Sequence, residues 1–163
     1  MLGIDPGTAI IGWGVIDCEN ESNKIKVIAY GHIETDKNLS DYERLSEITD
    51  NILAIIAKYE PDETAIEELF YFKNAKTVIS VAQARGVIMN TCYRKNLTIA
   101  EYTPLQIKQS LTGYGRAEKA QMQKMVKSVL KLDSIPKPDD TADALAVALC
   151  HINSRRFVQK INN

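Results

Sequence analysis

The feature of this sequence that most constrains its fold is the stretch Ile4-Asp5-Pro6-Gly7-Thr8, which precedes an apolar run over residues 10–16. An apolar segment ends at a carboxylate, turns at Pro-Gly and continues as a second apolar segment. The fixed φ of Pro6 and the tolerance of Gly7 for positive φ favour a tight turn. The pattern predicts a hairpin that holds Asp5 at the end of a strand. Such a hairpin can present a metal-binding carboxylate or a phosphate loop, and an Asp before a turn can also simply bond its own backbone.

The periodicity of apolar residues along the rest of the chain predicts three antiparallel strands, followed by helices that alternate with two more strands. Ser40 and Glu43 form a capping box for the first helix, which stops before Pro61. Thr103-Pro104 starts another helix as an N-cap followed by Pro at the first helical position. The expected strands are 1–5, 10–18, 24–35, 63–67 and 97–102, and the expected helices are 40–60, 74–94, 104–111, 118–130 and 140–153.

This order predicts an α/β fold whose five-stranded mixed sheet is flanked by helices. The strand at 63–67 is expected to lie parallel to the first strand, because a helical crossover precedes it. Residues 1–154 are expected to form a single domain, and residues 155–163 a frayed tail. The 163-residue length suits one domain with a full core.

Composition excludes several classes of protein. The apolar fraction of 45% and the charged fraction of 25% are ordinary for a soluble globular chain, and no apolar run approaches membrane-spanning length. Met1 leads into a strand without a signal-peptide pattern. Cys18, Cys92 and Cys150 are far apart, which favours reduced thiols in a cytoplasmic protein over a disulfide frame or a zinc site. The two histidines are isolated, which argues against a His-based metal site or a Ser-His triad.

The net charge of −1 conceals a strong asymmetry along the chain. Residues 1–72 hold 5 basic and 15 acidic side chains, and residues 73–131 hold 11 basic and 2 acidic ones. Residues 132–163 hold 4 of each. One run of positive charge is usually a solvated helix face, but here the basic residues extend over several expected elements. We therefore expect a surface that binds a polyanion, with no membrane partner.

Four carboxylates are placed to converge. Asp5 ends the first expected strand and Glu67 ends the fourth, so parallel pairing of these strands would bring both to one edge of the sheet. Asp140 and Asp143 share a face of the last helix near its start. Taken alone, this Asp pair is explained as well by an N-cap and a capping-box partner. Taken with Asp5 and Glu67, it predicts a cluster of four acids.

Like charges at contact distance repel strongly, so four ionised carboxylates require cations. Oxygen ligands without His or Cys select Mg²⁺ or Mn²⁺ over zinc. Two such ions held roughly 4 Å apart cleave phosphodiesters by in-line attack, one activating the attacking water and the other stabilising the leaving oxygen.

Six motifs, in this order and spacing, resemble the RuvC family of Holliday-junction resolvases over Leu2 to about Ser154. They are Gly3-Ile4-Asp5-Pro6-Gly7, Ala65-Ile66-Glu67, Gln83-Ala84-Arg85-Gly86, Lys108-Gln109, Ala117-Glu118-Lys119 and Asp140-Thr141-Ala142-Asp143-Ala144-Leu145-Ala146. The resemblance implies a ribonuclease H-like fold and a Mg²⁺-dependent, structure-selective endonuclease for four-way DNA junctions in recombination and repair. It also implies a homodimer and cooperation with a RuvA–RuvB branch-migration complex.

The resemblance assigns roles to individual residues. Asp5, Glu67, Asp140 and Asp143 match the catalytic, metal-binding acids, for two Mg²⁺ ions that Mn²⁺ can replace. Contacts to DNA are expected at Phe70, Lys73, Arg85, Lys108, Arg116 and Lys119, with Lys108 and Lys119 beside the cleaved strand. Phe70 is explained equally well as a core residue after a strand. The N-terminus is one or two residues shorter than the family pattern, which leaves Asp5 intact.

Three other functions fit parts of the pattern. Actin-like ATPases and sugar kinases open with a similar hairpin, but they need two related domains and a second phosphate loop. A non-catalytic junction binder would have lost acidic ligands, and all four are present here. A ribonuclease H or a transposase would use similar acids, but the motif at residues 83–86 and the two lysines favour the resolvase.

For the dimer we expect an interface on the helix at 74–94, through Val78, Val81, Ala82, Val87, Ile88 and Met89.

Overall fold

The computed structural model describes residues 1–18, 24–69 and 78–161, with side chains as far as Arg155. Its centre is a five-stranded mixed sheet in the order β3-β2-β1-β4-β5. Strands β1, β2 and β3 form an antiparallel meander, whereas β4 pairs with β1 and β5 with β4 in parallel. The strands are β1 (Leu2–Asp5), β2 (Ile10–Cys18), β3 (Ile25–Glu34), β4 (Glu63–Glu67) and β5 (Thr98–Tyr102). This confirms the predicted mixed sheet and the parallel crossover from β1 to β4.

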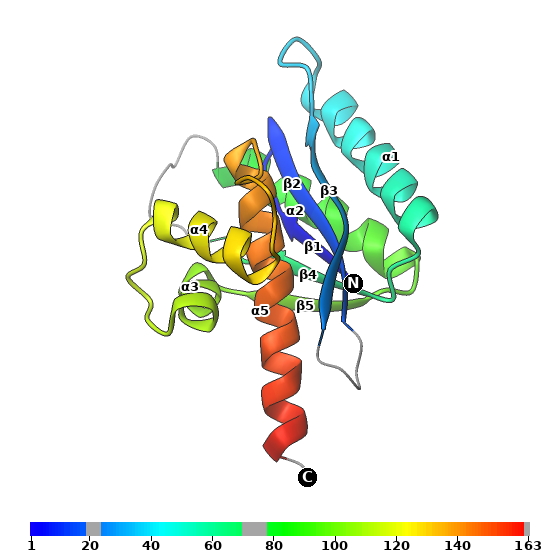
Figure 1. Ribbon diagram of the computed structural model, residues 1–163. Coiled ribbons are helices and arrows are strands. Elements are labelled where there is room, and N and C mark those ends of the chain that lie inside the picture. The colour runs from blue at the N-terminus through cyan, green and yellow to red at the C-terminus, as the bar shows by residue number, and fades with distance from the viewer. Residues whose placement is uncertain (19–23, 70–77, 162–163) are drawn as a thin grey trace.

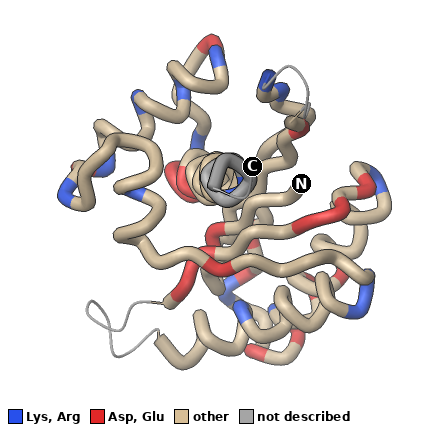
Figure 2. Tube along the Cα trace, turned by 90° about the horizontal axis from the view of Figure 1, so that it is seen from below, with Lys and Arg blue, Asp and Glu red and all other residues tan. Residues whose placement is uncertain are grey.

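Five helices cover the two faces of this sheet (Figure 1). They are α1 (Asp41–Tyr59), α2 (Val78–Arg94), α3 (Pro104–Thr112), α4 (Lys119–Val129) and α5 (Asp139–Ile161). Helices α1 and α2 pack together on one face, while α5 lies across the other face with α3 and α4 beside it. Figure 2 shows α5 nearly end-on against the strands.

The strand period of two residues separates these layers. Leu2 and Ile4 point toward α1 and α2 and are completely buried in the core on that side. Gly3, between them, faces α5, where a Cβ would lie 2.4 Å from the carbonyl oxygen of Ala144. Asp5 continues the face of Gly3, so its carboxylate points toward α5 rather than into the core behind the sheet.

The helix boundaries agree closely with those expected. The capping box of Ser40 and Glu43 starts α1, and Thr103 caps α3 through its contact with the backbone N–H of Gln106. The main difference is α5, which continues to Ile161 instead of ending at Asn153. No Gly or Pro interrupts residues 153–161, and Arg155 is bonded at 2.7 Å to the Glu63 carboxylate, so nothing ends the helix earlier. The expected start of α2, at residue 74, lies outside the described residues.

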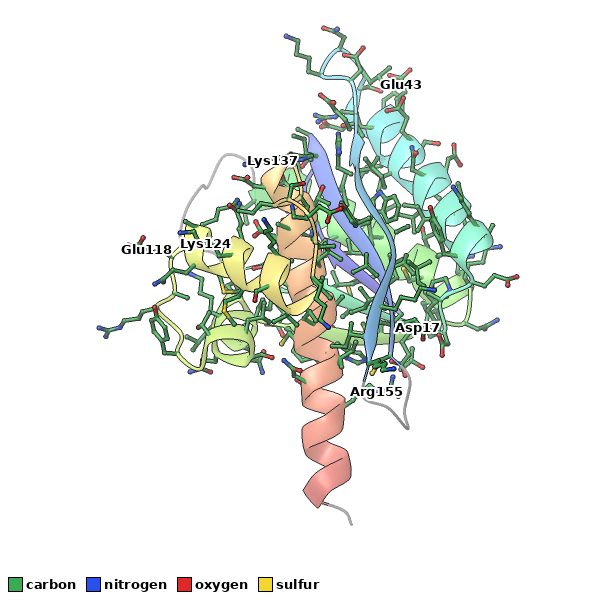
Figure 3. The ribbon with its side chains drawn as sticks, viewed as in Figure 1. Asp17, Glu43, Glu118, Lys124, Lys137 and Arg155 are labelled. Carbon is green, nitrogen blue, oxygen red and sulfur yellow. The ribbon has the colours of Figure 1, made fainter. Side chains whose placement is uncertain are left out.

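Figure 3 shows which of its labelled residues lie toward each end of the sheet. Lys137 lies near the start of α5, at the end of the sheet where β1 and β4 finish, while Asp17 and Arg155 lie toward the opposite end.

Cys92 and Cys150 are buried thiols and Cys18 is a partly buried one. In the part of the chain that the structure describes, no helix has the length and apolar character needed to span a bilayer.

Candidate active site

The site begins where β1 and β4 end side by side. Ile4 pairs with Ile66 in the parallel register, so Asp5 and Glu67, the next residues, come together at one edge of the sheet. Their carboxyl groups lie close enough to share a hydrogen bond. A hydrogen bond between two carboxyl groups requires that one of them carry a proton. The structure thus brings together the two strand-end acids as expected.

Helix α5 brings the other two acids to the same place. Gly12 lies directly opposite Asp5 in the β1–β2 pair, and a Cβ on Gly12 would lie only 1.8 Å from the carbonyl oxygen of Asp140. The Thr141 hydroxyl donates a 3.1 Å hydrogen bond to the carbonyl of Gly31 on β3. The first turn of α5 is therefore seated on the sheet, with Asp140 next to Asp5 and Asp143 one turn further along. Helix α5 already includes Asp139, so Asp140 lies within the helix rather than at an N-cap.

Crowding of these acids changes their proton affinities. Burial, and then the charges of Glu67 and Asp143, raise the pKa of Asp5 well above its usual range. Burial, and then the charge of Asp143, raise the pKa of Glu67 to about 7. Burial also raises the pKa of Asp143, although Lys119 opposes this. Burial is thus the largest cause at each of these three acids, and the charges of neighbouring acids add to it.

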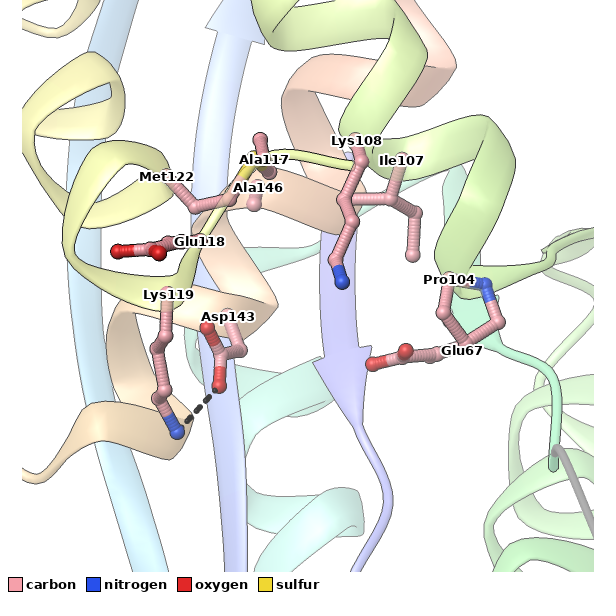
Figure 4. A pocket seen from close by; sticks show the side chains of 10 residues that line it. All are labelled: Glu67, Pro104, Ile107, Lys108, Ala117, Glu118, Lys119, Met122, Asp143 and Ala146. Carbon is pink, nitrogen blue, oxygen red and sulfur yellow. Dashed lines mark ion pairs between the residues drawn. The ribbon is translucent and has the colours of Figure 1, made fainter. Parts of the chain in front are cut away.

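Two lysines of the described residues bring positive charge to this cluster. Lys119, at the start of α4, forms a 3.0 Å ion pair with Asp143. Partial burial lowers the pKa of Lys119, but the hydrogen bond and charge of Asp143 more than compensate, so its pKa is raised and it stays charged. Lys108 of α3 acts electrostatically on Glu67. Figure 4 shows both lysines extending into the same pocket as Glu67 and Asp143.

This pocket has a volume of about 370 Å³ and opens between the sheet edge and three helices. Its charged lining residues are Glu67, Asp143, Lys108, Lys119 and Glu118 (Figure 4). The remaining lining residues are Pro104, Ile107, Ala117, Met122 and Ala146. Acids that would bind cations are thus arranged beside bases that would bind phosphates, which is the arrangement expected for hydrolysis of a phosphodiester.

The turn that follows Asp5 is held from two sides. The Thr35 hydroxyl donates a 2.7 Å hydrogen bond to the carbonyl of Thr8, and Arg44 donates in turn to the Thr35 oxygen at 2.8 Å. On the other side the Thr8 and Ser80 hydroxyls lie 3.2 Å apart. The position of Asp5 therefore depends on β3, α1 and α2 as well as on the Pro-Gly turn.

The donor set fits a hard divalent cation. The four acids offer oxygen ligands, while His151 is bonded elsewhere, to Tyr102 and Glu63. Among the side chains that the structure describes, no three potential ligands already enclose an ion position. Asp5 is hydrogen-bonded to Glu67, and Asp143 is paired with Lys119. A bound divalent cation would offset the burial and mutual repulsion that raise the pKa values of Asp5 and Glu67.

The residues expected to contact DNA lie in three different settings. Lys108 and Lys119 extend into the pocket, and Arg116 is exposed on the connection from α3 to α4. Phe70 and Lys73 lie outside the described residues. Arg85 differs from the expectation: its guanidinium is directed into the protein, where it is bonded to Glu101 and to the carbonyl of Glu67.

Two supports of the site were absent from the sequence interpretation. Gly12 carried a usable signal, because a glycine inside a strand often marks a close backbone approach, and Gly14 repeats it two residues later. No sequence signal predicted the hydrogen bonds donated by Arg44 and Thr35, because these two residues come together only when the chain has folded.

The comparisons with known proteins agree with one another. The family model described as crossover junction endodeoxyribonuclease RuvC matches residues 1–151. A protein of that name from Caldicellulosiruptor saccharolyticus is 59% identical over 158 residues, which cover 97% of this chain and 95% of that protein. The Thermus thermophilus RuvC structure superposes with a TM-score of 0.87 at 31% identity, covering 96% of both chains. The structure of T. thermophilus RuvC in complex with a Holliday junction substrate superposes with a TM-score of 0.88 at 30% identity, covering 96% of this chain and 94% of that one.

Proposed function

Because this chain belongs to the RuvC family of crossover junction endodeoxyribonucleases, we propose that it resolves four-way DNA junctions by paired nicks in two strands. The chain is a nuclease of the ribonuclease H-like fold. The observation that supports cleavage at this site is the meeting of Asp5 and Glu67 at the sheet edge, with Asp143 and Lys119 opposite.

The four acids form the metal site of this proposal. Asp5, Glu67, Asp140 and Asp143 would hold two Mg²⁺ ions, or Mn²⁺ in their place. When bound, these ions supply the charge that activates the attacking water and stabilises the leaving oxygen. Asp5 and Glu67 sit on rigid strands, so their oxygens are preorganised. In-line attack with the 3′ oxygen leaving would produce 5′-phosphate and 3′-hydroxyl ends, which a ligase can join.

The lysines bind and orient the cleaved strand. Lys108 and Lys119 reach into the pocket from two helices, where they would neutralise the phosphates next to the acids. Lys119 would also stabilise the charge that develops in the transition state, because it already points at Asp143. Arg116 would contact the backbone of the DNA further out, and Phe70 and Lys73 remain proposed contacts on residues that are not described.

Paired cleavage requires two sites, so we propose a two-fold symmetric homodimer. A junction has approximate two-fold symmetry, and a closed dimer presents two identical sites related by the same operation. Helix α2 remains the proposed interface, with one change. Ile88 is fully buried in the core behind the sheet and is not available to a partner, whereas Ile79 on the same helix is 68% exposed.

We further propose that residues 1–154 form one nuclease domain, that the enzyme acts in the cytoplasm, and that it acts with the RuvA–RuvB complex. The family resemblance supports each of these.

The test compares a synthetic four-way junction with a linear duplex of the same sequence, with Mg²⁺ and with EDTA. We expect cleavage of the junction alone, only with the metal, at symmetric positions on two strands. Ligation of the products would verify the 5′-phosphate and 3′-hydroxyl ends. Equal cleavage of the duplex would refute the structure selectivity, and junction binding without cleavage in any divalent cation would indicate a non-catalytic binder.

A further inference from the structure

Arg85 of α2 makes two contacts that tie this helix to the edge of the active site. Its Nε donates a 3.2 Å hydrogen bond to the backbone carbonyl of Glu67, and its Nη2 forms an ion pair with the carboxylate of Glu101 on β5. The Arg85 side chain is only 17% exposed. Its guanidinium is therefore used inside the protein, on the side of the sheet opposite to the pocket.

The second partner of Arg85 lies next to the same strand end. Glu101 pairs with Ile66 in the β4–β5 register, so it sits beside the residue that precedes Glu67. On the other side of Glu67, the backbone N–H of Glu68 donates a 2.9 Å bond to the carbonyl of Tyr102. The peptide that follows Glu67 is thus held at its carbonyl by Arg85 and at its N–H by β5.

From these contacts we infer that Arg85 is a positioning residue for Glu67, acting together with Glu101, and not a contact to DNA. The inference rests on the proposed role of Glu67 as a metal ligand. Strand β4 ends at Glu67, so no further strand pairing restrains the peptide beyond it except the bond to Tyr102. Arg85 supplies the second restraint, and the orientation of the Glu67 carboxylate follows from the orientation of its backbone.

The guanidinium is suited to this task in a way that an ammonium is not. Arginine is planar and donates from several nitrogens in a fixed geometry, so one side chain reaches a carbonyl and a carboxylate at once. Lysine keeps the charge but is a single flexible point donor. Arg85→Lys therefore preserves charge while removing the two-point restraint, and Glu101→Gln removes the ion pair while preserving Arg85.

Three measurements on the full-length protein distinguish positioning from DNA contact. The first is the affinity for a four-way junction in EDTA as a function of salt concentration. The second is the single-turnover cleavage rate as a function of Mg²⁺ concentration. The third is the binding of Mn²⁺ in the absence of DNA, measured by calorimetry. Arg94→Lys is the matched control, since Arg94 is an exposed arginine at the end of the same helix. Thermal unfolding of each variant shows whether it is folded.

For Arg85→Lys and Glu101→Gln we expect unchanged junction affinity in EDTA. Mn²⁺ binding should weaken, and the Mg²⁺ concentration needed for cleavage should rise, each roughly 10–100-fold, as when the partner of a metal ligand is removed. The double variant should be no worse than either single one, because both act through one contact. Arg94→Lys should match the wild type.

The opposite pattern would overturn the inference. If Arg85→Gln, which removes the charge, reduces junction affinity and makes the salt slope less negative by about 0.9, with metal binding unchanged, Arg85 is a phosphate contact. Wild-type metal binding and cleavage in both single variants would show that the restraint is dispensable. Should Arg85→Lys not fold, Glu101→Gln alone decides between these outcomes. Failure of the proposed function is separate, because the wild type itself would then not cleave the junction.

Discussion

The backbone of Asp140 occupies the space that a side chain on Gly12 would fill, since a Cβ there would lie 1.8 Å from the Asp140 carbonyl oxygen. Gly12 is also the residue that pairs with Asp5 across the β1–β2 ladder. A single glycine therefore sets the distance between an acid on the sheet and an acid on α5, two elements far apart in the chain.

Gly12→Ala should displace the start of α5 and separate Asp140 from Asp5. The atom that this Cβ would meet belongs to the backbone of α5, so the helix itself must move, and overpacking of this kind costs about 1–3 kcal/mol. We expect a lower free energy of unfolding in urea, together with slower junction cleavage. Gly86→Ala is the control, because nothing lies within 4 Å of a Cβ there. In the middle of α2 it should instead add about 0.5–1 kcal/mol of stability. Wild-type stability and cleavage in Gly12→Ala would show that the close contact has no such role.

Asp143→Asn should remove cleavage and retain junction binding. The substitution preserves the shape of the side chain and a hydrogen-bond acceptor for Lys119, but it removes one negative charge from the metal site. We expect the single-turnover rate in Mg²⁺ to fall by roughly 10²–10³-fold, as for other groups that act on charge in the transition state. Electrophoretic mobility shifts in EDTA should match those of the wild type. Cleavage near the wild-type rate would show that Asp143 is not a required metal ligand.

Lys119→Ala should weaken both binding and catalysis. Loss of one neutralised phosphate makes the slope of log affinity against log salt less negative by about 0.9. The loss of positive charge beside Asp143 should slow cleavage as well, because Lys119 is bonded to that acid at 3.0 Å. Lys58→Ala serves as the comparison, since Lys58 lies at the end of α1 on the other face of the sheet. If Lys119→Ala changes neither the slope nor the rate, this lysine belongs to a solvated surface.

The metal-free protein should lose stability as the pH rises. Glu67 has a pKa of about 7 in the folded protein and 4.5 when exposed, so the folded state binds its proton more tightly than the unfolded state does. The stabilising contribution is complete below pH 4.5 and is lost as the pH rises through about 7. Urea unfolding in EDTA between pH 5 and pH 8 should show this decline, and Glu67→Gln should reduce it. Added Mg²⁺ should restore stability at pH 8. An increase in metal-free stability over the same interval would contradict the structure of the acid cluster.

Ile79→Glu should weaken the proposed homodimer. Ile79 is 68% exposed on α2, and a charge at the centre of an apolar contact is costly to bury. Light scattering should show a dimer for the wild type and a smaller species for the variant, and junction cleavage should shift from paired to single nicks. Tyr42→Glu, at another strongly exposed position on α1, should stay dimeric. A wild-type protein that is monomeric at all concentrations would refute the dimer.

Much of the fold was predictable because its signals are local. The capping box at Ser40, the Thr103-Pro104 start and the alternating apolar residues each act within a few positions of the chain, so they can be recognised without any tertiary contact. The end of α5 was misjudged for the converse reason. Its extension beyond Asn153 is held by Arg155 reaching Glu63, a residue from another element 92 positions earlier.

The sequence by itself determined which chemical groups this protein has and which elements carry them: Asp5 and Glu67 at the ends of two strands, and Asp140 with Asp143 on a final helix. Only the tertiary structure decided how they meet. The close approach at Gly12 and the inward turn of Arg85 depend on residues brought together by the packing of helices on the sheet. The type of a residue determines which groups its side chain can bond to. Which of those groups becomes its partner depends on distances that arise only when the whole chain has folded.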